Sequence, residues 1–192
     1  MVLTLHIRHE GSHQYLARVF DGKVQVGAAT LHARIDEAIA AYGADIVRIA
    51  GIYDESVQEA ARLAAAHGWQ VIADTSYDGY EDIPRDVMQG YGAIAEEIVE
   101  QTSAQRGRAG TFTHVFLQGG VGGMAAGLAS YFWEYHGPQR PRFISVEPAQ
   151  ADCLLQSARA GAVVAVKGDL DTLMAGLACG EVSLLAWDFL AT

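Results

Sequence analysis

The strongest constraint on the fold is a cluster of glycines that joins an apolar run to a helical pattern. Four of the five residues from Gly119 to Gly123 are glycine. The run before them, His114–Gln118, is typical of a buried strand, and Met124–Tyr135 after them is predicted to be a helix. Glycine lets backbone N–H groups approach an anion, and the helix N-terminus adds partial positive charge. We therefore predict a phosphate-binding loop formed by Gly119, Gly120, Val121, Gly122 and Gly123; a tightly packed strand-to-helix turn is the alternative.

Short apolar runs alternate with longer helical patterns along the chain. The predicted strands are Val24–Val26, Asp45–Ile49, Trp69–Ala73, His114–Gln118, Arg142–Val146 and Val163–Val166. The predicted helices are Leu31–Ala41, a helix that Asp54 or Ser56 caps and Gly68 ends, Asp86–Thr102, Met124–Tyr135 and Ala149–Arg159. Because this alternation favours parallel strands, we predict one α/β domain over residues 1–192, with three αβα layers around a mostly parallel sheet. Residues 1–33 carry the weakest pattern.

Charge and hydropathy argue against several classes of protein. The chain has 192 residues, with 13 Lys and Arg against 23 Asp and Glu, and the resulting net charge of −10 repels phosphate backbones. Nucleic-acid binding is therefore not expected. No apolar run is long enough to cross a membrane, and Met1–His9 lacks a signal-peptide pattern. These features favour a cytoplasmic protein without membrane contact.

The metal-ligating and thiol side chains predict no special chemistry of their own. His6, His9 and His13 are close in the sequence, but their spacing matches no known ligand framework. We predict no metal site. The two cysteines, Cys153 and Cys179, are too few for a disulfide framework, and Cys179 is interpreted as a packed core thiol.

The glycine cluster is compatible with more than one phosphate ligand. Gly120, Gly122 and Ala125 match the dinucleotide pattern G-x-G-x-x-A, and Glu147 follows the next predicted strand, where a ribose-binding acid is expected. A domain that binds NAD is therefore one alternative. The two remaining glycines of the cluster are not required by that pattern and better suit a wider loop around one terminal phosphate. No Gly-Lys-Ser/Thr triplet is present, which disfavours nucleotide hydrolysis.

Five motifs occur together in an order and spacing that resembles the diaminopropionate ammonia-lyase family. They are DTSYDGYEDIP at 74–84, MQGY at 88–91, THVFLQGGVGGMAAG at 113–127, SVEPAQADC at 145–153 and MAGLACGE at 174–181. The resemblance covers residues 34–187. It implies part of the fold-type II pyridoxal phosphate fold, which is similar to the tryptophan synthase β subunit. The glycine motif is shared by that whole fold type, whereas DTSYDGY and MAGLACGE are more specific.

The resemblance also implies an activity and a set of site residues. The family eliminates ammonia from 2,3-diaminopropionate with pyridoxal 5′-phosphate (PLP) and yields pyruvate and a second ammonia. By this resemblance the glycine loop holds the cofactor phosphate, and Asp74 takes the α-proton of the L-substrate. Glu10 corresponds to the family's second acid, and Ser12 corresponds to an asparagine that contacts the cofactor ring oxygen. The implied partners are a small amino-acid substrate and a second copy of the chain in a homo-oligomer, expected to be a dimer.

The chain departs from the family pattern at its lysines. Its two lysines are Lys23 and Lys167, and neither aligns with the lysine that binds the family's cofactor. A segment that contacts the pyridine nitrogen in the family also has no counterpart here. A fragment, a truncated paralogue and a product of a shifted reading frame all fit this pattern. We therefore expect impaired or absent turnover and no covalent attachment of PLP; a non-catalytic module that binds a phosphate ligand or a partner is the second alternative.

Overall fold

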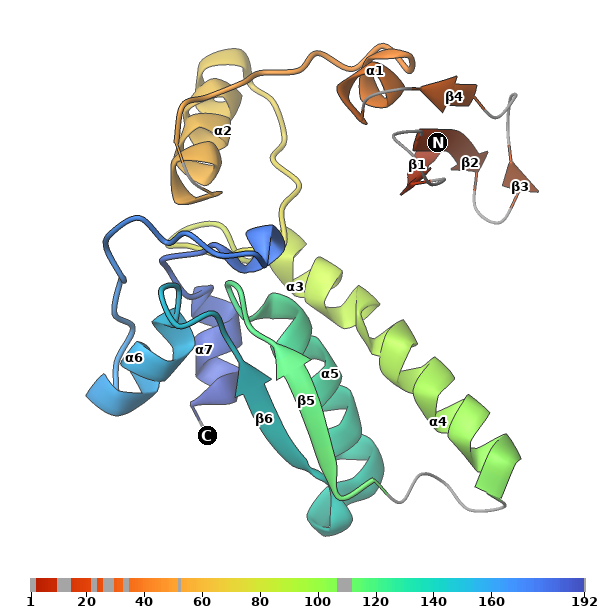
Figure 1. Ribbon diagram of the computed structural model, residues 1–192, viewed down its shortest axis with the longest axis vertical. Helices are drawn as coiled ribbons and strands as arrows, with labels where there is room; N and C mark the ends of the chain where they lie inside the picture. Colours follow the sequence, from red (N-terminus) through yellow and green to blue (C-terminus); the bar gives the residue numbers. More distant parts are fainter. Residues whose placement is uncertain are drawn as a thin grey trace. The chain divides into compact units, whose positions relative to one another are not determined.

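The computed structural model describes residues 3–9, 15–21, 24–25, 30–32, 35–51, 53–106 and 112–191 (Figure 1). They belong to two compact units, Met1–Ala50 and Gly51–Thr192. Each unit is described by itself below. None of the helices in this part of the chain is long and apolar enough to cross a lipid bilayer.

The first unit contains a small antiparallel sheet and one short helix. Its elements are β1 (Leu3–His9), β2 (Tyr15–Asp21), β3 (Val24–Gln25), β4 (Thr30–His32) and α1 (Ile35–Ala40). Strand β2 pairs antiparallel with each of the other three strands. The strand predicted at 24–26 is present as β3, and the helix predicted from residue 31 begins four residues later because residues 30–32 pair with β2 instead.

The second unit is α/β with a small parallel sheet. Its elements are α2 (Tyr53–His67), α3 (Asp82–Gly90), α4 (Gly92–Arg106), β5 (His114–Gln118), α5 (Gly123–His136), β6 (Arg142–Val146), α6 (Cys153–Ala160) and α7 (Leu184–Leu190), with short 3-10 turns η1 (Gly137–Gln139) and η2 (Ala175–Leu177). Strands β5 and β6 pair in parallel register, from His114 opposite Arg142 to Gln118 opposite Val146. Helix α5 is the crossover between them, as a parallel pair requires.

The core of the second unit forms around α5. This helix packs against α3, α4, α7 and β5, so residues on most of its circumference are buried. Phe132 is fully buried and contacts the rings of Phe112 and Phe143. The other buried members of the cluster are small or aliphatic: Ala95, Val99, Leu117, Ala125, Leu128 and Ala129. The small side chains explain how α5 approaches its neighbours closely.

The parallel sheet is covered unequally on its two faces. Leu117 of β5 is 3% exposed and belongs to the α5 core, whereas its neighbour Phe116 is 67% exposed. Side chains alternate between the faces of a strand, so these two residues report the two faces separately. Within the described residues, the α5 face is buried and the Phe116 face is open. Of the predicted α/β fold, the structure therefore supports a small parallel sheet.

Three predicted strands are wrong. Asp45–Ile49, Trp69–Ala73 and Val163–Val166 form no strand in the structure. Their apolar and β-branched residues indicate burial, but a strand also needs a neighbouring backbone with which to form hydrogen bonds. None of the described segments pairs with these three as a strand ladder.

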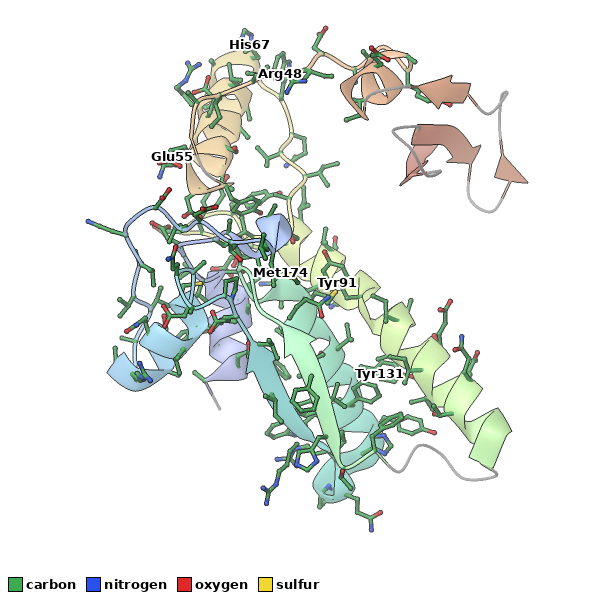
Figure 2. The ribbon with its side chains drawn as sticks, viewed as in Figure 1. Arg48, Glu55, His67, Tyr91, Tyr131 and Met174 are labelled. Atoms are coloured by element: carbon green, nitrogen blue, oxygen red, sulfur yellow. The ribbon has the colours of Figure 1, made fainter. Side chains whose placement is uncertain are left out.

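The single helix predicted at Asp86–Thr102 is also wrong in its extent. The structure has two helices here, α3 and α4, which are separated at Tyr91. Gly90 and Gly92 flank this break, and glycine weakens a helix because it loses more backbone freedom on folding. The break sets Tyr91 at the junction of the two helices (Figure 2), and its hydroxyl group interacts with Asp74.

Candidate cofactor-binding site

The glycine loop connects β5 to α5 through positions where a side chain would collide. Gly119 continues the sheet, because its N–H donates to the carbonyl of Val146 at 2.8 Å. A Cβ at Gly119 would lie 2.7 Å from the Ser145 hydroxyl oxygen. Gly122 has φ +95°, in the left-handed region that favours glycine. Close packing thus explains two of the glycines without any ligand.

The end of the loop nevertheless fits an anionic group. Gly122 precedes the first turn of α5 and provides no side chain that could cap it, and that turn contains no acidic residue. The N–H groups in the first turn of a helix have no partner within the helix and carry partial positive charge. An uncapped helix that begins in a glycine loop is suited to bind a phosphate. The residues present therefore fit the phosphate of PLP.

Asp74 lies directly against this loop. A Cβ at Gly123 would be 3.0 Å from the backbone carbonyl oxygen of Asp74, tighter than most real Cβ contacts, so glycine favours this approach. The Asp74 carboxylate accepts a hydrogen bond of 2.9 Å from the hydroxyl of Tyr53 in α2. The contact at Gly123 joins Asp74 to the glycine loop, although the two are far apart in the sequence.

The hydroxyl groups around Asp74 are held in their protonated form. Burial, together with the charge of Asp74 and a hydrogen bond to it, raises the pKa of Tyr53 well above its ordinary value. The pKa of Tyr91 is raised by the same three causes, with burial again first. A phenol that keeps its proton can only donate to a carboxylate. Both phenols are therefore hydrogen-bond donors to Asp74 at neutral pH.

The segment after Asp74 is anchored to the start of α7. The backbone N–H of Ser76 donates to the hydroxyl oxygen of Ser183 at 3.0 Å, and the two hydroxyl oxygens are 2.9 Å apart. Both serines are buried. The N–H of Ser183 in turn donates to the carbonyl of Val121 at 2.8 Å. Ser183 thus connects the Asp74 segment to the glycine loop from the opposite end of the chain.

The two cysteines pack against the glycine loop at Gly120. The Cys153 thiol donates to the carbonyl of Gly120 at 3.4 Å, and a Cβ at Gly120 would lie 3.3 Å from the Cys179 sulfur. Burial is the largest cause that raises the pKa of Cys153 to about 12 and that of Cys179 to about 11. Thiols with such raised pKa values are unreactive near neutral pH. The prediction of Cys179 as a packed core thiol is confirmed.

Glu147, the acid that would complete a dinucleotide pattern, forms hydrogen bonds with the start of α6. Its two carboxylate oxygens accept hydrogen bonds from the N–H groups of Leu154 at 2.8 Å and Leu155 at 2.9 Å. Burial raises the pKa of Glu147 despite these bonds. The carboxylate satisfies N–H groups at the N-terminus of α6, which a helix otherwise leaves without partners. Glu147 therefore has a structural role that does not require a ribose.

The remaining predicted site residues lie outside the described part of the chain. Glu10 and Ser12 fall in the sequence between β1 and β2, and the structure describes neither. Within the ranges that are described, no group of three or more His, Cys, Asp or Glu side chains is arranged to hold a metal ion. Sequence reasoning missed Tyr53 and Ser183. Their contacts cross 21 and 107 residues, and no local pattern signals such partners.

Comparison with known proteins agrees with the geometry of this site. The family model described as "Pyridoxal-phosphate dependent enzyme" matches residues 23–192, and the chain belongs to this family. Within it, the chain is homologous to the diaminopropionate ammonia-lyase of Escherichia coli strain K12, with 45% identity over 157 residues. That alignment covers 82% of this chain and 38% of the relative, so the chain spans well under half of the relative's length.

Solved structures of the same relative superpose on this chain. The E. coli diaminopropionate ammonia-lyase in complex with an aminoacrylate-PLP azomethine reaction intermediate gives a TM-score of 0.72 at 40% identity, over 82% of this chain and 39% of that chain. The same enzyme in complex with D-serine gives a TM-score of 0.71 at 42% identity, over 81% and 38%. The chain is thus structurally similar to fold-type II PLP enzymes.

Proposed function

We propose that this chain provides the phosphate-binding loop and the L-substrate base of a PLP-dependent lyase that converts 2,3-diaminopropionate to pyruvate and ammonia. The observation that carries this proposal is the contact between the Asp74 carbonyl and Gly123, which brings the acid to the anion-binding loop. The homology to a lyase for this substrate supports the choice of reaction.

In this proposal each residue has a defined task. The amides of Gly119–Gly123 and the N-terminus of α5 hold the cofactor phosphate. Bound PLP supplies the electron withdrawal that acidifies the α C–H bond of an amino acid. The Asp74 carboxylate accepts the α-proton of the L-substrate, and the Tyr53 hydroxyl orients that carboxylate by the bond it donates. By resemblance, Glu10 serves as the acid for the D-substrate and Ser12 contacts the cofactor ring.

A cavity of about 280 Å³ lies beside the segment that follows Asp74. Its lining includes Tyr53, which donates to Asp74, together with Thr75 and Ser76. We further propose that the protein is a cytoplasmic homodimer. We also propose a three-layer αβα fold, in which the sheet is larger and its open Phe116 face is covered. Because neither Lys23 nor Lys167 matches the family's cofactor lysine, PLP is expected to bind this chain reversibly and without detectable turnover.

The proposal is tested by comparing ligands in thermal unfolding. A ligand that binds only the folded chain raises the melting temperature, by about 3–5 °C when its concentration is about ten times its Kd. We expect PLP to stabilise the chain and pyridoxal, which lacks the phosphate, to have little effect. The variant Asp74→Asn should keep the stabilisation by PLP, because Asp74 is not part of the phosphate loop.

The same experiment includes outcomes that contradict the proposal. Equal stabilisation by PLP and pyridoxal would show that the glycine loop does not bind the cofactor phosphate. Stabilisation by NAD instead of PLP would favour the dinucleotide alternative. A borohydride-stable PLP adduct at Lys23 or Lys167, or steady release of pyruvate, would show that the chain is a complete catalyst.

A further inference from the structure

The segment that leads into Asp74 is held by a side chain where a strand was predicted. Trp69–Ala73 forms no strand, and Figure 1 draws it as a coil between α2 and α3. One hydroxyl group, that of Tyr80, makes two hydrogen bonds to this segment. It donates to the carbonyl of Val71 at 3.0 Å and accepts from the N–H of Ala73 at 3.1 Å.

These two backbone groups are the pair that a neighbouring parallel strand would use. In a parallel ladder one residue bonds to a carbonyl and to an N–H two positions further along the facing strand. Val71 and Ala73 have this spacing. A phenol is both a donor and an acceptor, so it can satisfy both groups at once. The Tyr80 hydroxyl therefore makes the two hydrogen bonds that one residue of a neighbouring parallel strand would make, next to Asp74.

Tyr80 is itself placed by a tight turn. Tyr77 and Tyr80 exchange backbone hydrogen bonds of 2.9 and 3.3 Å, and Gly79 between them has φ +78°. A positive φ at this position of a turn favours glycine. The rings of the two tyrosines stack with their centroids 4.9 Å apart. The turn brings the Tyr80 hydroxyl back to the residues that precede Asp74.

We propose that Tyr80 is a positioning residue for Asp74, which fixes the backbone on the N-terminal side of the acid. Ser183 anchors the other side through Ser76, so the Asp74 carboxylate is held between two attachment points. This inference rests on the proposed function, in which Asp74 accepts a proton. Tyr80 contacts no reacting atom in this role; it acts on the geometry of Asp74 through Ala73.

The test removes one hydroxyl group at a time from the stacked pair. Tyr80→Phe deletes both hydrogen bonds and keeps the ring, whereas Tyr77→Phe deletes a hydroxyl that makes neither bond. Two readouts are taken on the unliganded chain: hydrogen exchange of the Ala73 amide, and the NMR signal of the ¹³C-labelled Asp74 carboxyl carbon, assigned with Asp74→Asn. We expect Tyr80→Phe to exchange the Ala73 amide about threefold to tenfold faster and to move the Asp74 signal. Tyr77→Phe should change neither.

The outcomes separate this inference from the proposed function. Unchanged exchange and an unmoved Asp74 signal in folded Tyr80→Phe would overturn the role of Tyr80. If Tyr80→Phe does not fold, p-aminophenylalanine at position 80, which also donates and accepts, should restore folding and protect Ala73; a folded chain without that protection would equally overturn it. Since neither readout needs the cofactor, failure of PLP to stabilise the wild-type chain would contradict the proposed function alone.

Discussion

Two phenols, those of Tyr53 and Tyr91, donate hydrogen bonds to Asp74. Burial and the charge of Asp74 raise the pKa of both Tyr53 and Tyr91, so both remain protonated at any physiological pH. A hydrogen bond from a neutral donor orients a carboxylate without adding a positive charge that would compete for it. This arrangement suits the proposed role of Asp74 as the acceptor of the substrate's α-proton.

The bond between Tyr53 and Asp74 should also stabilise the fold. Tyr53→Phe keeps the ring and deletes the donor of the 2.9 Å hydrogen bond. Because the acceptor is a charged and partly buried group, we expect a loss of about 1–2 kcal/mol in the free energy of unfolding. Urea denaturation measures it, with Tyr135→Phe as the control, since Tyr135 is 48% exposed. Equal midpoints for the two variants would contradict the prediction.

At the scale of elements, α5 depends on glycine for its approach to other backbones. A Cβ at Gly127 would lie 2.5 Å from the carbonyl oxygen of Met88 in α3, much closer than any real contact. Figure 2 shows Tyr131, one turn further along α5, toward α4, and a Cβ at Gly92 would lie 3.6 Å from its ring. The close contacts of α5 with α3 and α4 hold the Tyr91 junction in place.

The same substitution should therefore have opposite effects at two glycines. Gly127→Ala forces α5 and α3 apart, and we expect it to destabilise the chain by about 1–3 kcal/mol. Gly90→Ala places its Cβ where no atom lies within 4 Å, at the end of α3, and should stabilise by about 0.5–1 kcal/mol. Urea midpoints of the two variants give the comparison. A destabilised Gly90→Ala, or a neutral Gly127→Ala, would show that the contact is wrong.

The elements that could be predicted are those whose pattern is local. Strands β5 and β6 have the predicted bounds, and α5 differs by one residue at each end. The residues of each segment alone carry the pattern that predicts it. Trp69–Ala73 shows what such a pattern lacks: its apolar residues predict burial but do not specify a partner strand. Ser183 lies 107 residues from Ser76, so its role could only be found in three dimensions.

At the scale of the whole molecule, the burial of two thiols makes the free energy of unfolding decrease at alkaline pH. The folded chain retains the protons of Cys153 and Cys179 up to pKa values of about 12 and about 11. The unfolded chain releases them near pH 8.5. Hydroxide therefore favours unfolding: the stabilisation is complete below the unfolded pKa and is lost as the pH rises through the folded values.

This linkage predicts the slope of a pH titration of stability. Between pH 9 and 10 the free energy of unfolding should fall by about 1.2 kcal/mol for each thiol, because each releases most of one proton on unfolding. Urea denaturation across this range measures the slope, and the double variant Cys153→Ala, Cys179→Ala should flatten it. An unchanged slope in that variant would assign the alkaline loss to other groups.

The link between Ser76 and Ser183 has a consequence for synthesis of the chain. The two residues are separated by 107 positions, and ribosomes add roughly 5–20 residues per second. Asp74 is therefore translated about 5–20 s before Ser183, the residue that anchors its C-terminal side. Until α7 is translated, the neighbouring glycine loop also lacks the Ser183 N–H that bonds to Val121. Asp74 and the glycine loop therefore reach their final arrangement only after α7 has been translated. A nascent chain that stalls before α7 lacks these hydrogen bonds.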